Sequence, residues 1–453
     1  MLKISIISVF PVLHKPFLEM SLIARSIQEK KVQCQSFAYS DFCEPGERID
    51  VSIAGHGPGM VIKPEVVART IEHVEQLHGP SYRIFFSPQG KLLTQDLLRQ
   101  LASFSLNQDE SDTDESKKLD NSNLDDRQKY ISKHILLICS RYEGMDVRVE
   151  EHYADMLLSV GDYVLMGGEA AANLFLEGFL RLLPGVVGNA DSVAEESFEE
   201  GLLDYPSYAL PTVWQGYQMP EVIRSGNHKA LQEWRSSAAL RKTMLFRFDL
   251  IKKLGLEKKH RKEALSKIPS HYIVLMHSDV IIKNGDVGNT SVGSFNLHDI
   301  CRSARTYGIK QVFIVTPLED QHRIIQTFLD FWHGKSGKEY NSQRADAISL
   351  LKIVRSFDEV KKIISDDEGQ NPLLLTTSAK TYDNVPAIDY QSQNIVWQLE
   401  KPILLIFGTG QGLASYIMDQ SDFILKPIYG LTDYNHLSVR SAIAIILDRW
   451  LGF

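Results

Sequence analysis

The apolar run Ile135-Leu136-Leu137-Ile138-Cys139 leads directly into the polar segment Ser140-Arg141-Tyr142-Glu143-Gly144-Met145-Asp146, and this junction decides the fold class. A short apolar run without alternation is typical of a strand in a parallel sheet that is covered on both faces. Open α/β sheets bind ligands beyond the carboxyl ends of such strands, so the polar segment is a candidate ligand loop. The junction therefore predicts an α/β protein with a binding site where its strands end.

The same alternation of apolar runs and helical spacing extends along most of the chain. In the first half we expect strands at residues 4–10 and 83–86 and a helix at residues 16–30. After Pro269 the pattern restarts, with expected strands at residues 272–276, 311–315, 373–377 and 402–407 and helices at residues 297–307 and 438–451. The pattern predicts two α/β units in series, each with a parallel sheet flanked by helices.

Two segments interrupt this pattern. Residues 103–132 are rich in Ser, Asp, Asn and Glu and lack the apolar positions that a core needs, which predicts a disordered acidic insertion. Residues 229–267 contain many Lys and Arg residues but few carboxylates, so a solvated helical linker and an RNA-contacting patch both fit them. We therefore expect a first domain at residues 1–228, a basic helical linker at residues 229–269 and a second domain at residues 270–453.

The overall composition limits the class of protein. The chain has 453 residues, 43% of them hydrophobic and 23% charged, which is typical of a soluble globular protein with more than one domain. Its longest apolar runs fall far short of the roughly 20 residues that span a bilayer. The four scattered cysteines predict reduced thiols in a cytoplasm and no metal site. The net charge of −8 argues against indiscriminate coating of nucleic acid, so neither a membrane nor DNA is an expected partner.

Further glycine-containing segments lie where strands are expected to end, namely Gly57-Pro58-Gly59-Met60, Ser87-Pro88-Gln89-Gly90 and the stretch from Val160 to Glu169. None has the spacing of a dinucleotide loop or of a phosphate-binding loop. Each alone is more often a tight turn than a ligand loop, because glycine is needed wherever φ is positive. Together they predict a site of backbone amides and carbonyls, which suits a ligand with an adenine edge and a zwitterionic tail.

Residues 1 to about 240 resemble the bacterial tRNA (guanosine-37 N1) methyltransferases of the SPOUT class. The resemblance rests on Ile6-Ile7-Ser8-Val9-Phe10-Pro11, Gly57-Pro58-Gly59-Met60, Ser87-Pro88-Gln89-Gly90, Arg141-Tyr142-Glu143-Gly144, Gly161-Asp162-Tyr163-Val164-Leu165, Leu182-Leu183-Pro184-Gly185-Val186, Glu196-Ser197-Phe198, Gly201-Leu202-Leu203-Asp204-Tyr205-Pro206 and Ser225-Gly226-Asn227-His228. It implies a trefoil-knotted fold, which general folding rules would discard. It also implies tRNA as the partner and an obligate homodimer with shared active sites.

The resemblance further implies which residues bind the methyl donor S-adenosyl-L-methionine. They are Ser87, Pro88, Gly90, Ser140, Tyr142, Val160, Gly161, Asp162, Tyr163, Val164, Leu165, Gly167 and Gly168. The family also suggests a requirement for Mg²⁺. Residues 229–269 would then be a reduced form of the region that grips the tRNA.

Two residues match the catalytic pair of the family. Methylation at N1 of guanine requires removal of the N1 proton, for which a carboxylate is the simplest base. A cation near O6 would stabilise the negative charge that develops. In the family an Asp before Ser-Phe is the base and an Arg about one helix earlier assists; the matching residues here are Glu196 and Arg181. Residues 189–198 would fold over the target guanine.

Residues 271–453 resemble a small SPOUT RNA methyltransferase domain that is found fused or free in some bacteria. The resemblance rests on the stretch from Asn296 to Gly308, on Val315-Thr316-Pro317-Leu318, on Phe407-Gly408-Thr409-Gly410-Gln411-Gly412-Leu413 and on the stretch from Asp433 to Ala442. It implies donor contacts at Thr377, Gly408, Gly410, Gly412, Ile428, Leu437 and Ser438 and an RNA contact at Arg302. A surface ion pair between Arg302 and Asp299 and a plain strand-to-helix turn at residues 408–412 are the alternatives.

Three functions follow from these observations. The favoured one is methylation of N1 of guanosine 37 in tRNA, with a second RNA methyltransferase-like domain. The alternative is a non-catalytic or altered-specificity tRNA-binding SPOUT protein, because Glu196 replaces the expected Asp and lengthens the arm by one methylene. A dinucleotide-dependent α/β enzyme is disfavoured by the missing glycine fingerprint.

Overall fold

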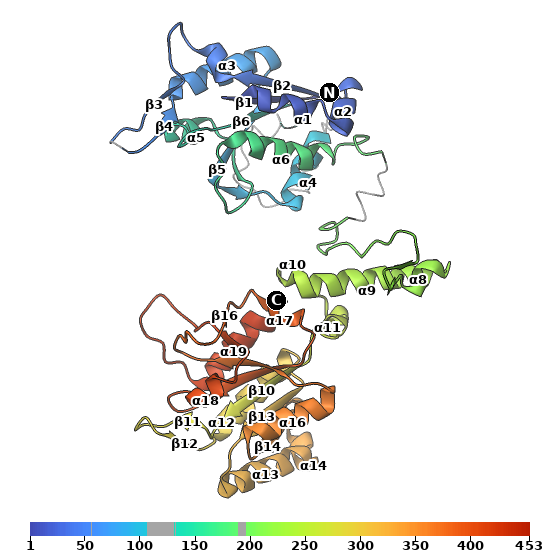
Figure 1. Cartoon of the computed structure of the whole chain (residues 1–453), viewed down its shortest axis with the longest axis vertical. Coiled ribbons are helices and arrows are strands. Elements are labelled where there is room, and N and C mark those ends of the chain that lie inside the picture. The colour runs from blue at the N-terminus through green and yellow to red at the C-terminus, as the bar shows by residue number, and fades with distance from the viewer. Residues whose placement is uncertain (56, 107–130, 132, 189–195) are drawn as a thin grey trace. The chain divides into compact units, whose positions relative to one another are not determined.

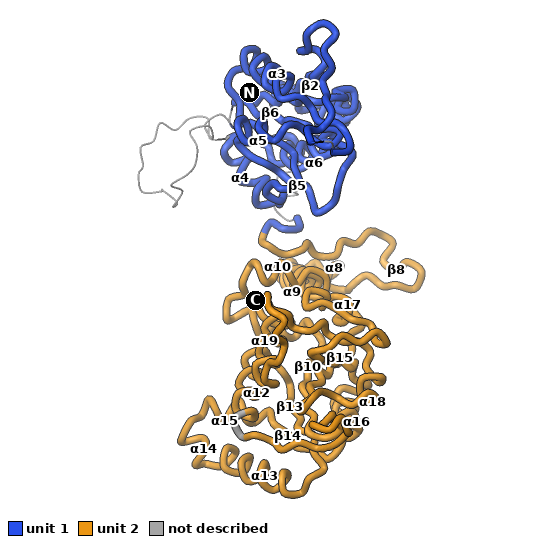
Figure 2. Tube along the Cα trace, turned by 90° about the vertical axis from the view of Figure 1, so that its left-hand side faces the viewer, with its two compact units in different colours: residues 1–199 blue, residues 200–453 orange. Residues whose placement is uncertain are grey.

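The computed structural model describes residues 1–453 except residues 56, 107–130, 132 and 189–195. The chain forms two compact units, unit 1 (Met1–Glu199) and unit 2 (Glu200–Phe453), which Figure 2 draws in different colours. Figure 1 labels the elements of both. Each unit is a parallel sheet flanked by helices, so the predicted α/β class is confirmed.

Five parallel strands form the sheet of unit 1. Their order is β2 (Val32–Ala38), β1 (Leu2–Ser8), β6 (His134–Ile138), β5 (Tyr82–Leu92) and β7 (Met156–Ser159). Ile4 and Ile6 of β1 face one core cluster, whereas Ile7 faces another, so both sides of the sheet are covered. The described part of unit 1 also contains η1 (Pro11–Leu13), α1 (Lys15–Leu18), α2 (Ser21–Gln28), η2 (Tyr39–Phe42), β3 (Asp50–Ser52), β4 (Met60–Ile62), α3 (Pro64–His78), α4 (Gln95–Leu106), α5 (Val147–Tyr153) and α6 (Gly168–Leu180).

Seven parallel strands form the main sheet of unit 2. Their order is β14 (Leu351–Val354), β13 (Gln311–Val315), β10 (His271–Met276), β17 (Ile403–Gly408), β15 (Leu373–Thr377), β18 (Phe423–Leu425) and β16 (Ala387–Ile388). The described part of the unit also contains β11 (Val280–Ile281), β12 (Val287–Gly288), α12 (Ser294–Thr306), α13 (Glu319–His333), α14 (Lys335–Tyr340), α15 (Ser342–Ile348), α16 (Phe357–Glu368), α17 (Gln393–Trp397), α18 (Ser415–Met418) and α19 (Val439–Leu451).

The central strands of the two sheets follow the same path. Counted along the chain, the five strands of unit 1 lie side by side in the order second, first, fourth, third and fifth, which is β2-β1-β6-β5-β7. The five inner strands of unit 2, counted without the outer strands β14 and β16, have the same order, which is β13-β10-β17-β15-β18. In each sheet the strands that come next along the chain lie on one side of the first strand, and the later strands lie on its other side. The two groups meet between β1 and β6 in unit 1 and between β10 and β17 in unit 2. Open α/β sheets bind ligands at such a switch point, which marks the corresponding end of each sheet as the place for a site.

Residues 200–269 group with unit 2. They contain the hairpin of β8 (Val213–Trp214) and β9 (Tyr217–Gln218) and the helices α8 (Glu221–Arg224), α9 (His228–Phe246), α10 (Phe248–Leu254) and α11 (Lys258–Leu265). Leu240, Met244, Phe248 and Ile251 of α9 and α10 belong to the same core cluster as β10 and α12. This apolar contact explains why the basic stretch is part of a compact unit.

The predicted elements are present with shifted bounds, and two predictions were wrong. The single helix expected at residues 16–30 is two helices, α1 and α2, because the chain turns at Met20 and Ser21, where φ is +37°. Residues 103–106 belong to α4 rather than to the acidic insertion, since the amphipathic spacing of α4 continues through them. The rest of the predicted insertion lies outside the described residues, apart from residue 131.

Candidate functional site

Ser87, Pro88 and Gly90 form a bulge in β5. Phe86 and Lys91 both pair with Leu158 of β7, so the residues between them leave the ladder. A Cβ on Gly90 would lie 2.4 Å from the backbone nitrogen of Leu158, and therefore only glycine allows the bulge to lie against β7.

Ser140 and Tyr142 follow β6, which is the neighbour of β5. The backbone carbonyl of Ser140 accepts a hydrogen bond of 2.7 Å from the N–H of Gly168, and Arg141 pairs with Gly167 as an isolated bridge. Tyr142 has φ of +61° and leaves its side chain half-exposed. The predicted donor residues after β6 and those before α6 are therefore side by side.

The loop after β7 carries the other predicted donor residues, Val160, Gly161, Asp162, Tyr163, Val164 and Leu165. The hydroxyl of Tyr163 donates to the carbonyl of Val160 at 3.3 Å, and the ring covers the position that a side chain on Gly161 would take. Val164 is 91% exposed, so the loop presents apolar side chains at the surface.

A buried carboxylate joins these loops, and the sequence analysis missed it. Glu169, in the first turn of α6, is 3% exposed. It accepts a hydrogen bond of 2.9 Å from the hydroxyl of Ser8 and one of 3.2 Å from the guanidinium of Arg141, which also lies over the ring of Phe10. The signal that could have found it is an acidic residue directly after the glycine pair that begins a helix.

The two predicted catalytic residues are in contact. Nη2 of Arg181 lies 2.5 Å from Oε1 of Glu196, and each side chain is about one-third exposed. Arg181 directly follows α6. Arg99 of α4 donates to the carbonyl of Phe198 at 2.6 Å and pairs with Glu199 at 2.9 Å, which fixes the chain just beyond Glu196. Residues 189–195 of the predicted cover over the guanine lie outside the described residues.

The predicted donor loop of unit 2 follows β17, at the switch point of the sheet. Gly410 has φ of +60°, and a Cβ there would lie 2.6 Å from the carbonyl oxygen of Ile281. The N–H of Gln411 donates to this carbonyl, and the N–H of Ile281 donates to the carbonyl of Gly412, both at 2.8 Å. Residues 408–412 are therefore held against β11.

The other predicted donor residues of unit 2 lie on strand ends and at the beginning of α19. Thr377 ends β15 and donates through its hydroxyl to the carbonyl of Ile406 at 2.9 Å. Ser438 caps α19, its neighbour Leu437 is partly exposed, and Ile428 packs against the core.

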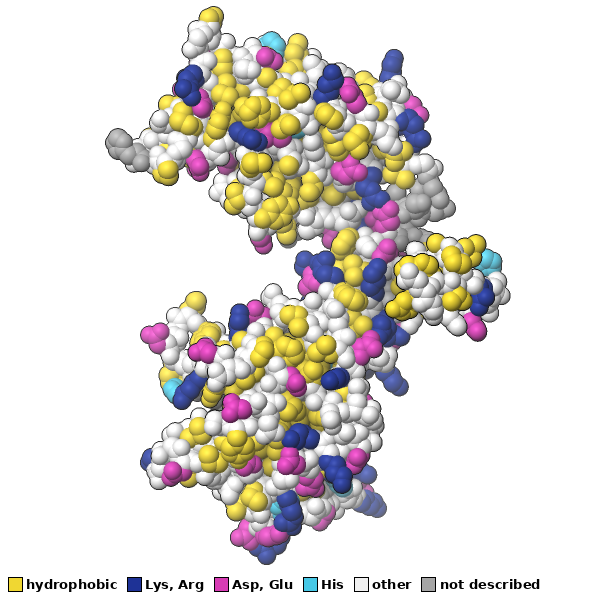
Figure 3. Space-filling view, in the orientation of Figure 1, with side chains coloured by type: hydrophobic (Ala, Val, Ile, Leu, Met, Phe, Trp, Pro, Cys, Tyr) yellow, Lys and Arg dark blue, Asp and Glu magenta, His cyan; other side chains and the backbone are white. Residues whose placement is uncertain are grey.

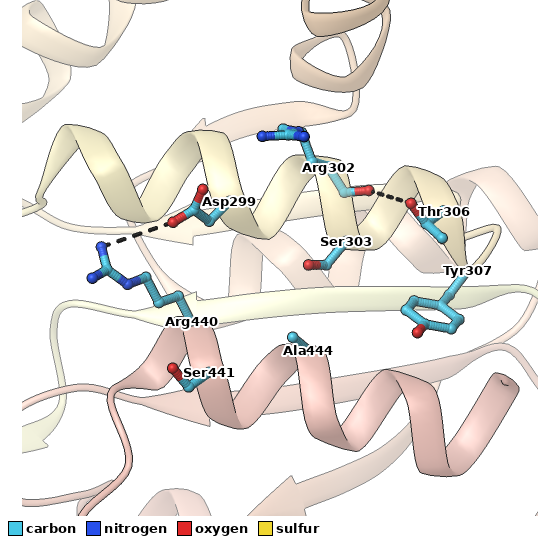
Figure 4. A pocket seen from close by; sticks show the side chains of 8 residues that line it. All are labelled: Asp299, Arg302, Ser303, Thr306, Tyr307, Arg440, Ser441 and Ala444. Carbon is cyan, nitrogen blue, oxygen red and sulfur yellow. Dashed lines mark hydrogen bonds and ion pairs between the residues drawn. The ribbon is translucent and has the colours of Figure 1, made fainter.

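Arg302 lines an open groove between α12 and α19 with a volume of about 490 Å³ (Figure 4). The lining residues are Asp299, Arg302, Ser303, Thr306, Tyr307, Arg440, Ser441 and Ala444. Asp299 pairs with Arg440 at 3.8 Å, so the alternative ion pair with Arg302 is not formed. Within the described residues the guanidinium of Arg302 has no ion pair.

Most cations of the basic stretch already have partners within unit 2. Residues 229–267 contain twelve Lys and Arg residues. Eight contact a carboxylate, a carbonyl, a hydroxyl or an aromatic ring: Arg235, Arg241, Lys242, Arg247, Lys252, Lys259, Arg261 and Lys267. Among the described residues Lys229, Lys253, Lys258 and Lys262 make no ion pair. Figure 3 shows the charged side chains on one face of the molecule.

In the described part of the chain, no group of three or more His, Cys, Asp or Glu side chains could hold a metal ion. No described helix combines the length and apolarity that crossing a membrane requires. All four cysteines are free thiols.

Comparisons with known proteins match two families along the chain, and the first match extends beyond unit 1 to residue 253. A family model described as tRNA (Guanine-1)-methyltransferase TrmD matches residues 2–106 and 115–253, and one described as SAM-dependent RNA methyltransferase matches residues 270–452. The chain is 37% identical to a protein of Nitratidesulfovibrio vulgaris named tRNA (guanine-N(1)-)-methyltransferase, over 88% of this chain and 87% of the relative.

Two further relatives carry the same name. The protein from Oleidesulfovibrio alaskensis is 33% identical over 100% of this chain and 99% of the relative. The protein from Thermosipho africanus is 36% identical but covers only 56% of this chain, although the match spans 91% of its own length. Relatives with the length of both units therefore exist beside shorter ones.

Proposed function

We propose that this chain, which belongs to the tRNA (guanine-N1)-methyltransferase family, transfers a methyl group from S-adenosyl-L-methionine to N1 of guanosine 37 in tRNA. The family match confirms the methyltransferase class predicted from the sequence and excludes a dinucleotide-dependent enzyme. The observation that carries the proposal is the contact between Arg181 and Glu196. It joins the cation and the carboxylate that this chemistry needs.

The loops of unit 1 fit the methyl donor. Gly90 and Gly168 let their loops lie directly against neighbouring backbone, which leaves amide and carbonyl groups at the end of the sheet. Such groups can pair with an adenine edge, and the residues proposed to hold the donor are the thirteen of the bulge in β5, the segment after β6 and the stretch from the end of β7 to the beginning of α6. When bound, the donor supplies an electrophilic methyl group.

The chain's own residues would prepare the guanine for attack. Glu196 takes the N1 proton, for which its carboxylate must exchange Arg181 for the N1–H of the entering base. Arg181 is then free to turn to O6, where negative charge collects as N1 loses its proton. Because Arg99 fixes the chain at Phe198, we assign this exchange of partners to rotation of the Arg181 and Glu196 side chains.

We also propose the trefoil knot and the homodimer that the family implies. Exposed apolar side chains near the donor loops support a dimer, because monomeric proteins rarely leave such groups uncovered together. They include Val12 and Leu13 after β1 and Val164 and Met166 after β7, which are 67%, 50%, 91% and 85% exposed.

Unit 2 is proposed to bind a second donor molecule at Thr377, Gly408, Gly410, Gly412, Ile428, Leu437 and Ser438 and to contact RNA through Arg302. Its family match and the guanidinium of Arg302, which makes no ion pair among the described residues, support this assignment. The four lysines without ion pairs in α9, α10 and α11 are proposed to contact tRNA phosphates. A Mg²⁺ requirement and a cytoplasmic location stay predictions.

Mass spectrometry of nucleosides tests the proposal. Purified protein is incubated with unmodified tRNA and S-adenosyl-L-methionine, and N1-methylguanosine is measured. Glu196→Gln should abolish the product, whereas Glu200→Gln, an exposed neighbour, and Arg302→Ala should retain it. Absence of N1-methylguanosine with the unaltered chain would favour the non-catalytic, tRNA-binding alternative.

A further inference from the structure

A chain of partly buried hydrogen bonds begins at the carboxyl end of β10. The hydroxyl of Thr409 donates to the carbonyl of Met276 at 2.8 Å. Oγ1 of Thr290 lies 2.6 Å from Oγ1 of Thr409, and Nδ1 of His277 lies 2.9 Å from Oγ1 of Thr290. His277 is 1% exposed, whereas Thr290 and Thr409 are partly exposed.

The direction of every proton in this chain is determined by chemistry. A backbone carbonyl can only accept a hydrogen bond, and a hydroxyl has a single proton to donate. Because the hydroxyl of Thr409 donates its proton to the carbonyl of Met276, it must accept a hydrogen bond from the hydroxyl of Thr290. Thr290 in turn must accept from His277. The Nδ1 atom of His277 therefore carries the proton, and in the neutral ring Nε2 is left as an acceptor.

That acceptor has no donor. Among the described residues nothing hydrogen-bonds to Nε2 of His277, although the atom is buried. Buried polar atoms are nearly always paired, and the exceptions call for a missing partner. Burial lowers the pKa of His277 to about 4, so the ring is neutral and its lone pair is free near neutral pH.

The location of His277 indicates the partner. β10 and β17 border the switch point of the sheet, and Thr409, two bonds away along the chain of hydrogen bonds, belongs to the predicted donor loop. Leu275 and Phe407, two residues before His277 and Thr409, face the core cluster that includes α12 and α19. The same face of the sheet therefore carries His277 and the donor loop.

We propose that Nε2 of His277 accepts a hydrogen bond from an N–H group of S-adenosyl-L-methionine bound to unit 2. This assignment rests on the proposed donor site of unit 2. Two groups of S-adenosyl-L-methionine can donate this N–H hydrogen bond, the α-ammonium group and the adenine 6-amino group.

Calorimetric titration of the full chain with S-adenosylhomocysteine tests the assignment. The unaltered chain should bind two molecules, one per unit. In His277→Asn the amide can still donate to Thr290 but cannot reach the position of Nε2, so one of the two affinities should fall about tenfold. In His277→Gln the side-chain amide reaches that position and should restore most of the loss.

Two controls separate ligand binding from a purely structural role. Thr290→Val breaks the chain of hydrogen bonds but keeps Nε2, so it should weaken binding less than His277→Asn does. Tryptophan fluorescence should report unaltered folding of each variant. With 5′-methylthioadenosine, which lacks the α-ammonium group, the loss in His277→Asn persists if the adenine amine is the donor and disappears if the ammonium is.

Two results would overturn the assignment. Equal affinities of the unaltered chain and His277→Asn for S-adenosylhomocysteine would show that Nε2 does not contact the ligand, with the donor site itself intact. Binding of a single molecule per chain would remove the donor site of unit 2 and the role of His277 together.

Discussion

His271 holds together two tryptophans in the core of unit 2, and its protonation should destabilise that unit. Its Nε2 accepts hydrogen bonds from the indole N–H groups of Trp397 at 3.2 Å and Trp450 at 3.1 Å, and its Nδ1–H donates to the carbonyl of Pro269 at 2.8 Å. A proton on Nε2 would face two donors. Burial lowers the pKa of His271 to about 4 from its usual 6.5.

The two pKa values determine the size and the direction of the effect. Because the folded-state pKa lies below the unfolded one, the stabilisation is complete above about pH 6.5 and is lost as the pH falls toward 4. With these two pKa values, proton linkage lowers the free energy of unfolding by about 2 kcal/mol between pH 7.5 and pH 5.0. His271→Gln keeps an acceptor oxygen near Nε2 but cannot be protonated there, so it should lack this loss.

Tryptophan fluorescence during urea unfolding measures the effect selectively, because all five tryptophans of the chain lie in unit 2. Between the two pH values the unaltered chain should lose about 2 kcal/mol more unfolding free energy than His271→Gln. Protonation of His277 contributes equally in the unaltered chain and in His271→Gln, so it cancels from the difference between them. His333→Gln, on the exposed end of α13, should behave like the unaltered chain. Equal losses in the unaltered chain and His271→Gln would refute a neutral, accepting His271.

Three further perturbations test unit 1 and the basic stretch. Gly90→Ala places a Cβ 2.4 Å from the Leu158 nitrogen, so donor affinity measured by calorimetry should fall about tenfold or more, whereas Gly188→Ala, with open space, should not change it. Glu169→Gln breaks the buried pair with Arg141 and should cost about 3 kcal/mol in scanning calorimetry, against no change for Glu200→Gln. The logarithm of tRNA affinity should fall with the logarithm of salt concentration with a slope of about −3, as four free lysines predict; a slope near −10 would mean that all twelve cations contact phosphates.

The sequence predicted the elements and loops of the site because their signals are local. A buried parallel strand is a short apolar run, and residues 135–139 and 311–315 were placed correctly to within one residue. The glycine-containing segments at residues 140–146 and 408–412 marked loops at the ends of β6 and β17. The contact between Arg181 and Glu196 was expected only through the family resemblance, since the two are separated by fifteen residues without helical periodicity.

The remaining parts of the site depend on contacts between distant residues. Glu169 and Ser8, which form a hydrogen bond, are 161 positions apart in the chain. Nothing in the sequence around them distinguishes Glu169 from other acidic residues in a first helical turn, or Ser8 from other serines at the end of a strand. The sequence also could not predict that eight basic residues make contacts within unit 2, because composition gives the number of charged residues but not their partners. Only the fold shows which of these cations have partners within unit 2.

The common strand order of the two units places these polar contacts in corresponding positions. In unit 1 the end of the first strand is joined to the loop after the fourth strand through Ser8, Glu169 and Arg141. In unit 2 the same strand ends are joined through His277, Thr290 and Thr409. The first connection uses both carboxylate oxygens and is complete in itself. The second is neutral and leaves Nε2 of His277 without a partner among the described residues, so the two units hold equivalent loops by different chemistry.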